Sequence, residues 1–170
     1  MPWVSRPPSP EIQAKVDLFN TFRGGYLSAF AQMEFTVGRL LSRFNSTDPF
    51  SGALNEVKFR FESRVDTFEE FFISRPELQN FTADALELCT GLRERYDLRN
   101  FLAHGIVRFD AETDEFTVRR ILPSQSDPWQ EVSLVVPFEV VAGELSKMSL
   151  FCQRFMFFAR EVSETYQLDF

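Results

Sequence analysis

Apolar residues recur at intervals of three and four along most of the chain, which is the spacing of one face of an α-helix. Gly24 and Gly25 interrupt this pattern early in the sequence, and we expect a break in the helix there. Helices are predicted over residues 10–22, 26–44, 53–74, 76–104 and 138–167. Their lengths and the short connections between them favour antiparallel packing in a bundle.

The period changes to two between the fourth and the last predicted helix. Residues 106–109 and 115–119 alternate between apolar and polar side chains, with acidic turn residues between them, which predicts a β-hairpin. A third short strand is expected over residues 132–136. The predicted fold is therefore mainly α, an antiparallel four- or five-helix bundle with a hairpin or three-stranded sheet inserted before the last helix.

A chain of 170 residues suits one domain with one substantial core. Residues 1–9 are rich in proline and are predicted to be a flexible segment. Residues 10–170 are predicted to form a single helical domain, with the β insertion at about 106–136. The 21 phenylalanines indicate a core of packed rings and an apolar surface that a second subunit could cover.

Charge and composition exclude several classes of function. The formal net charge of −7 excludes a protein that binds nucleic acid over its whole surface, so any such contact needs a local positive site. Two cysteines and one histidine give no zinc-site spacing and no disulfide framework, and neither a metal nor a cofactor is predicted. No apolar run is long enough for a signal peptide or a membrane span, so the cytoplasm is the predicted location.

Two charged residues interrupt the apolar stripes of predicted helices. Glu34 lies on the stripe of the second helix, and Arg99 lies on that of the fourth. Because buried charges must be paired, we expect these two side chains to meet. The pair would either fix the register of the helices as a salt bridge or hold the guanidinium of Arg99 toward a phosphate.

The only histidine, His104, follows Arg99 by five positions near the end of the fourth predicted helix. Histidine is the natural proton carrier at neutral pH, and arginine stabilises charge that builds on a phosphoryl group. RNA supplies its own nucleophile, the 2′-hydroxyl, so these two groups form a minimal set for cleaving it without a metal. A simpler interpretation is that an imidazolium suits the negative end of a helix.

Helix geometry separates these two groups. Five residues turn an ideal helix so that Arg99 and His104 point about 140° apart. Their convergence requires either that the helix frays near Ala103 or that two subunits contribute one residue each. The second arrangement agrees with the excess of phenylalanine and with the symmetry of homodimers.

The stretch Arg99-Asn100-x-x-Ala103-His104-Gly105 resembles the signature motif of the HEPN superfamily. This resemblance implies a helical domain, metal-independent endoribonuclease activity, a homodimer whose two motifs face each other, and often a role as a toxin or defence protein. It further implies that His104 is the general acid or base, that Arg99 binds the scissile phosphate and that Asn100 orients one of them. Glu34 would support the site, and an antitoxin protein is a possible partner.

Further arginines flank the motif. Arg95 precedes it and Arg108 follows it, and both are candidate substrate-binding residues. Arg119 and Arg120, on the predicted hairpin, could join Arg108 in a positive patch. The alternative is a solvated sheet face on which acidic residues balance the arginines, namely Asp110, Glu112, Asp114 and Glu115.

Two functions follow from these patterns, and whether the chain is an enzyme stays open between them. The first is a homodimeric endoribonuclease of the HEPN type, with RNA as the substrate. The second is a non-catalytic HEPN-like helical module that binds a protein or a nucleotide, in which Arg99 and His104 have structural roles.

Overall fold

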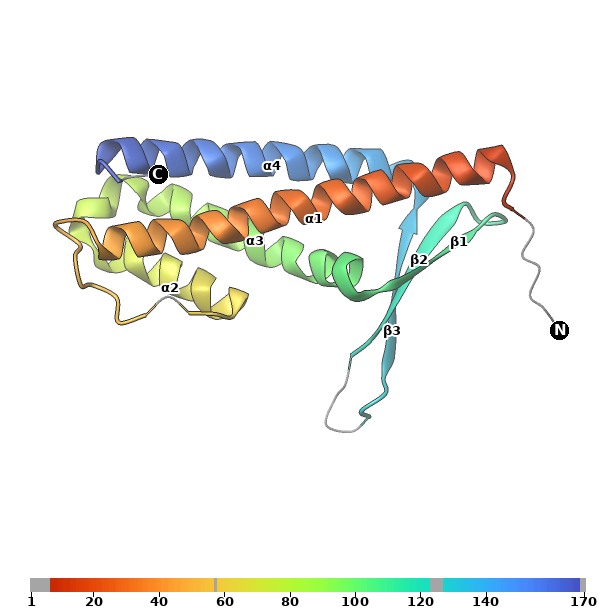
Figure 1. The fold of residues 1–170 in the computed structure, drawn as a ribbon, viewed down its shortest axis with the longest axis horizontal. Helices are drawn as coiled ribbons and strands as arrows, with labels where there is room; N and C mark the ends of the chain where they lie inside the picture. Colours follow the sequence, from red (N-terminus) through yellow and green to blue (C-terminus); the bar gives the residue numbers. More distant parts are fainter. Residues whose placement is uncertain (1–6, 57, 123–126, 169–170) are drawn as a thin grey trace. The chain divides into compact units, whose positions relative to one another are not determined.

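The computed structural model describes residues 7–56, 58–122 and 127–168 of the chain (Figure 1). Within these residues, four α-helices, one short 3-10 helix and three strands follow in the order α1 (Pro10–Asn45), α2 (Phe61–Ser74), η1 (Pro76–Leu78), α3 (Gln79–His104), β1 (Ile106–Asp110), β2 (Glu115–Ile121), β3 (Glu131–Pro137) and α4 (Phe138–Thr165). The predicted class, mainly α with a small sheet inserted before the last helix, is confirmed. The predicted flexible segment lies outside the described residues over positions 1–6.

Helix α1 is one continuous helix, and the predicted break at Gly24 and Gly25 is wrong (Figure 1). A glycine inside a helix costs only about 1 kcal/mol relative to alanine, which a long packed helix tolerates. Gly25 also has a packing role, because a Cβ atom added there would lie 2.8 Å from Cδ1 of Leu145 on α4. The glycine pair therefore permits close approach of a neighbouring helix rather than a bend.

The predicted helix over residues 53–74 is too long, because α2 begins at Phe61. Side chains hold the preceding segment in an irregular path: Asn45 Oδ1 accepts a hydrogen bond of 2.7 Å from the backbone N–H of Leu54. Arg64 donates to the carbonyl oxygens of Lys58 at 3.1 Å and Phe59 at 2.7 Å. Position 57, part of the predicted apolar stripe, lies outside the described residues.

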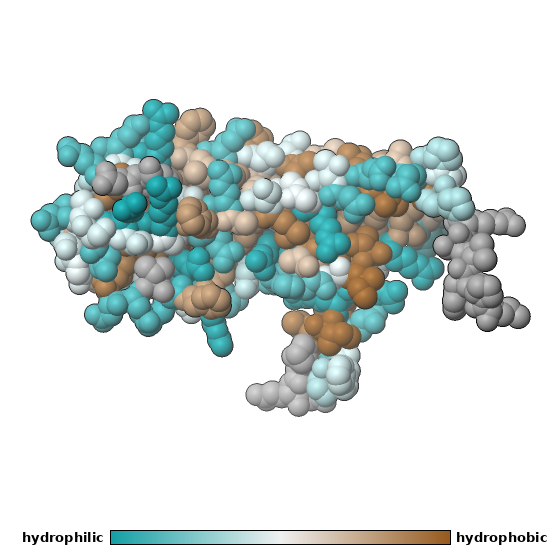
Figure 2. All heavy atoms as spheres, viewed as in Figure 1, coloured by the Kyte–Doolittle hydropathy of each residue, from teal (hydrophilic) through white to brown (hydrophobic). Residues whose placement is uncertain are grey.

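The three strands form one antiparallel sheet in the order β1-β2-β3, which confirms the predicted hairpin and third strand. Phe116 pairs with Phe109 on β1 and Val136 on β3, and with Val118 it is buried on what we call the inner face. The opposite, outer face carries exposed apolar side chains, namely Ile106, Ile121 and Val135. In the space-filling view, hydrophobic side chains reach the surface over the strands (Figure 2).

The described residues cluster into two compact units. One, here called the sheet unit, comprises the described parts of residues 1–27 and 98–147, and the other, the bundle unit, those of residues 28–97 and 148–170. Helices α1, α3 and α4 contribute to both. No helix among the described residues combines the length and the apolar character that crossing a membrane requires.

Packed phenylalanine rings form the core of each unit, as the composition indicated. In the sheet unit, Phe19 of α1 stacks on Phe116 of β2 with ring centroids 4.1 Å apart. In the bundle unit, the fully buried ring of Phe44 lies within 4.9–6.0 Å of four other rings, those of Phe50, Phe71, Phe72 and Tyr166. Burial of so much aromatic surface is the main source of stability in both units.

Candidate functional site

The candidate site begins where α3 ends and β1 starts. His104 is the last residue of α3, and the backbone N–H of Gly105 donates to the carbonyl oxygen of Phe101 at 2.8 Å, which closes the last turn. Gly105 is buried and its φ is not left-handed. A Cβ atom there would overlap the side chain of Val118 and lie 2.6 Å from the carbonyl oxygen of Phe101. Only glycine fits between Val118 and the Phe101 carbonyl oxygen at this position. It therefore allows β1 to begin one residue after the end of α3.

Arg23 of α1 stabilises the same helix end. Its Nε donates a hydrogen bond of 2.6 Å to the carbonyl oxygen of Leu102, one of the carbonyls that a helix C-terminus leaves without a helical partner. Sequence reasoning missed this residue. The signal was present, because Arg23 shares the apolar stripe of Phe19, Phe22 and Tyr26, as Glu34 and Arg99 share theirs.

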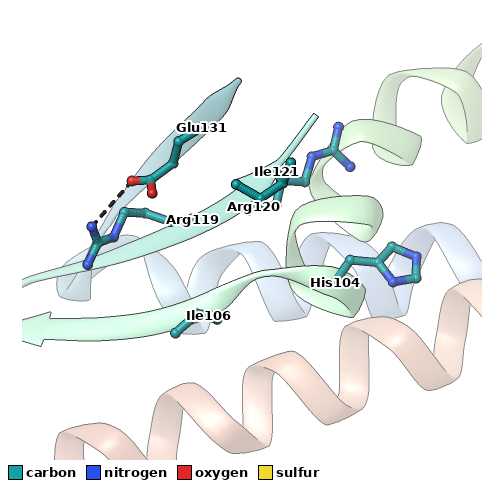
Figure 3. Close-up of a pocket in the computed structure, with 6 residues that line it drawn as sticks. All are labelled: His104, Ile106, Arg119, Arg120, Ile121 and Glu131. Atoms are coloured by element: carbon teal, nitrogen blue, oxygen red, sulfur yellow. Dashed lines mark hydrogen bonds and ion pairs between the residues drawn. The ribbon is translucent and has the colours of Figure 1, made fainter. Parts of the chain in front are cut away.

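A pocket of about 460 Å³ opens beside His104 in the sheet unit (Figure 3). It is lined by His104, Ile106, Arg119, Arg120, Ile121 and Glu131. The side chain of His104 is exposed, and within the described part of the chain nothing hydrogen-bonds to its ring. Both ring nitrogens therefore remain accessible to a ligand, unlike those of a histidine that serves to cap its own helix.

The two arginines of the pocket differ in their partners. Nη1 of Arg119 lies 3.3 Å from Oε1 of Glu131, so its charge is balanced across the strands (Figure 3). The guanidinium of Arg120 instead lies over the ring of Phe101, with 4.5 Å between Cζ and the ring centroid. Its buried Nε has no hydrogen-bond partner, and no carboxylate among the described residues pairs with it. Arg120 therefore gives the pocket an uncompensated positive charge.

Arg120 and His104 lie at one end of the pocket, whereas the ion pair of Arg119 with Glu131 lies at the other (Figure 3). A proton carrier and an uncompensated cation on neighbouring elements form the combination that phosphate chemistry uses. Of the three hairpin arginines that could form a positive patch, Arg119 is paired with Glu131 and Arg120 alone brings an uncompensated charge to the pocket. Arg108, a predicted substrate-binding residue, is exposed on the outer face and does not line the pocket.

The motif residues Arg99 and Asn100 contact each other. Nη1 of Arg99 donates to Oδ1 of Asn100 at 3.0 Å, and both side chains are partly buried. Helix α3 continues through His104, so the first of the two ways in which Arg99 and His104 could converge, fraying near Ala103, does not occur. Arg99 and His104 therefore keep the angular separation of a regular helix, and within one chain the helix does not bring them together.

The two other predicted residues, Glu34 and Arg95, belong to the bundle unit and have partners there. Oε1 of Glu34 lies 3.6 Å from Nη2 of Arg64, and the Glu34 carbonyl accepts a hydrogen bond of 3.3 Å from Nη1 of the same arginine. Arg95 donates to the carbonyl oxygen of Gly91 at 2.9 Å and lies over the ring of Phe151. The pairing of Glu34 with Arg99 stays a prediction, because Arg99 belongs to the other unit.

Metal-ligating side chains are not clustered in the described part of the chain, where no three His, Cys, Asp or Glu residues could hold one ion together. The two cysteines, Cys89 and Cys152, are free and buried. Burial raises the pKa of the Cys89 thiol to about 12 and also raises that of Cys152. Neither thiol is therefore a candidate nucleophile.

Comparison of the chain with models of known families, with curated proteins and with solved structures found no match. The resemblance to HEPN domains accordingly rests on the motif from Arg99 to Gly105 and on the mainly helical fold.

Proposed function

We propose that this protein is a metal-independent endoribonuclease of the HEPN type that acts as a homodimer. The observation that carries the proposal is the exposed ring of His104 beside the uncompensated guanidinium of Arg120 in one pocket. A histidine with a purely structural role would be expected to use its ring nitrogens within the fold. A role as a toxin or defence protein, with an antitoxin as partner, follows only from the resemblance.

In the proposed reaction, His104 takes the proton from a ribose 2′-hydroxyl, and the resulting oxygen attacks the adjacent phosphorus. The bond from phosphorus to the 5′-oxygen breaks, and this oxygen leaves with a proton from water. The products are a 2′,3′-cyclic phosphate and a 5′-hydroxyl end. Arg120 stabilises the charge that builds on the phosphoryl oxygens.

A second copy supplies what one chain lacks. Arg99 points away from His104 on a helix that stays regular through its last turn, so the two motif residues meet most simply when each copy contributes one. Asn100 holds Arg99 through its hydrogen bond of 3.0 Å and acts as a positioning residue.

The test is cleavage of a mixed-sequence RNA in EDTA by the wild-type protein, by His104→Ala, by Arg99→Ala and by Arg160→Gln. Arg160 is an exposed arginine paired with Glu164 on α4, which makes it a matched surface control. We expect cleavage by the wild type and the control, with cyclic phosphate ends, and loss of cleavage in the other two variants at unchanged melting temperature. Failure of the wild type to cleave RNA, or full activity of His104→Ala, would contradict the proposal.

A non-catalytic interaction module is the second candidate, and a different observation favours it. The outer face of the sheet exposes Ile106, Ile121 and Val135, each of which pairs with a polar residue of the neighbouring strand. If this face binds a protein partner, a triple substitution of these residues by serine abolishes complex formation. RNA would then remain intact with every form of the protein.

A further inference from the structure

The bundle unit has a second positively charged hollow, here called the arginine groove. It has a volume of about 630 Å³ and is lined by Phe35, Gly38, Arg39, Ser42, Arg43 and Arg64. Among the described residues that line it, three carry a guanidinium and none carries a carboxylate. Glu34, outside the lining, balances the charge of Arg64, so the positive character of the groove comes from Arg39 and Arg43 on α1. In a chain with a net charge of −7, two neighbouring arginines in one hollow favour an anionic ligand.

One cation of the groove, Arg64, is held in place. Arg64 is fixed by hydrogen bonds to the carbonyl oxygens of Lys58 and Phe59 and by its ion pair with Glu34. Gly38 gives it room to lie against α1, because a Cβ atom there would come within 3.4 Å of Nη1 of Arg64. Arg39 and Arg43 follow one helical turn apart on α1. Their spacing along the helix, about 6 Å, is close to the distance between successive phosphates of an extended strand.

An exposed aromatic ring completes the groove. Phe35 lies one turn before Arg39 on α1 and is 66% exposed, whereas most of the phenylalanines described in this unit are buried. The exposed ring lies in the same hollow as the guanidinium groups of Arg39 and Arg43. Flat rings beside arginines are the means by which proteins hold single-stranded nucleic acid, with bases on the rings and phosphates on the cations.

We propose that the arginine groove binds single-stranded RNA, with phosphates on Arg39 and Arg43 and a base stacked on Phe35. The inference deepens the proposed function, on which its choice of RNA as the ligand rests. An acidic peptide would satisfy the guanidinium groups equally, but it would not account for the ring. The groove holds the strand and takes no part in the bond cleavage, which belongs to the pocket beside His104.

The experiment measures binding of a fluorescent 2′-O-methyl oligouridine of about ten nucleotides, which lacks the 2′-hydroxyl nucleophile and matches the usual site size. The variants are Phe35→Ser, Arg39→Gln with Arg43→Gln, and Arg43→Lys, which keeps the charge. The matched controls lie on α4: Phe157→Ser, where the ring is 69% exposed, and Arg160→Gln. Melting temperatures verify that each variant is folded.

We expect Phe35→Ser to weaken binding by about 5- to 100-fold. The double arginine variant should weaken it by at least about tenfold and lower the dependence of log Kd on log salt by about 2, whereas Arg43→Lys keeps most of the affinity. Both controls should bind as the wild type does. Lack of binding by the wild type, or equal losses in groove and control variants, would overturn the proposal. So would a loss confined to the arginine variants, because an acidic peptide would then be the better ligand.

His104→Ala separates this inference from the proposed function. It should bind the oligonucleotide as the wild type does, because His104 does not line the groove. If RNA is bound through the groove but never cleaved, the proposed ribonuclease activity is contradicted and the proposal of RNA binding in the groove is supported. If RNA is cleaved and the groove variants bind it as the wild type does, the proposal of RNA binding in the groove is contradicted and the proposed ribonuclease activity is supported.

Discussion

The pocket beside His104 and the arginine groove present arginines to solvent in two different ways. In the pocket, Arg120 has a buried Nε without a partner and shares the space with the only histidine of the chain. In the groove, Arg64 is engaged by a carboxylate and backbone carbonyls, and no histidine lies among the lining residues. The first site can move a proton beside a phosphate, whereas the second can only hold an anion.

The difference teaches that charge alone does not distinguish a catalytic site from a binding site. Both hollows carry positive charge in an acidic protein, and both include apolar side chains. What separates them is a titratable ring whose nitrogens the fold leaves unused. Substitutions in the pocket beside His104 should therefore change the rate of the chemical step, whereas substitutions in the arginine groove should change the binding of RNA.

The largest expected effect is on the chemical step. His104→Ala should lower kcat by about 10²- to 10⁴-fold, the usual contribution of a positioned general acid or base, and leave KM nearly unchanged. Arg43→Gln in the groove should raise KM and leave kcat nearly unchanged. Steady-state cleavage of a fluorogenic RNA measures both values. Similar losses of kcat in the two variants would contradict the assignment of the chemical step to the pocket and of binding to the groove.

The next effect concerns the stability of the bundle unit. Phe44→Ala removes a fully buried ring with four aromatic neighbours and should lower the free energy of unfolding by about 3–5 kcal/mol. Phe35→Ala, at an exposed ring of the same helix, should change it by less than about 0.5 kcal/mol. Urea denaturation compares them. A large loss with Phe35→Ala would mean that this ring is structural and would weaken the assignment of the groove.

A smaller effect is expected where α3 turns into β1. Gly105→Ala introduces a Cβ atom against the Phe101 carbonyl oxygen and the Val118 side chain, so it should cost about 1–3 kcal/mol and shift His104. Cleavage activity should fall with stability in this variant. Gly24→Ala is the matched control, because a Cβ atom there meets nothing within 4 Å and should be neutral or slightly stabilising. Equal melting temperatures for both variants would contradict this packing.

The smallest effect is a pH dependence of stability in the bundle unit. Burial raises the pKa of Cys89 to about 12, so the unfolded chain releases the thiol proton at lower pH than the folded one. Above the ordinary thiol pKa of about 8.5, the folded state therefore loses stability as the pH rises. Cys89→Ala should show a shallower decrease between about pH 8 and 10 in denaturation experiments. Alkylation of Cys89 in the folded protein at pH 8 would contradict its burial.

Much of the fold follows from the sequence. The periodicity of three and four over 138–167, and the change to a period of two after Gly105, correctly predicted α4 and the sheet. The break at Gly24 and Gly25 was wrong because a glycine pair has the same local signature whether it bends a helix or admits a neighbour such as Leu145. The start of α2 was missed because the side chains of Asn45 and Arg64 bind the backbone of Leu54, Lys58 and Phe59, which a helical periodicity does not reveal.

The candidate site was predictable only in part. The sole histidine beside Gly105 at a helix end was evident, and it lies in a pocket with arginines. Which arginine accompanies it depends on strand register, which brings Arg119 and Glu131 diagonally across β2 and β3 and turns Arg120 to the opposite face over Phe101. The apolar stripe of α1 marked Arg23 as unusual, but its partner Leu102 and the contribution of Arg64 to the arginine groove depend on packing between segments that are far apart in the chain.

The most direct test of the proposed enzyme is complementation between two inactive variants. Arg99→Ala and His104→Ala proteins are mixed, unfolded and refolded together, and RNA cleavage in EDTA is measured. If each site combines Arg99 of one copy with His104 of the other, half of the dimers are mixed and each has one intact site, so roughly a quarter of wild-type activity returns. If the mixture remains as inactive as the separate variants while the wild type cleaves RNA, the composite site is contradicted.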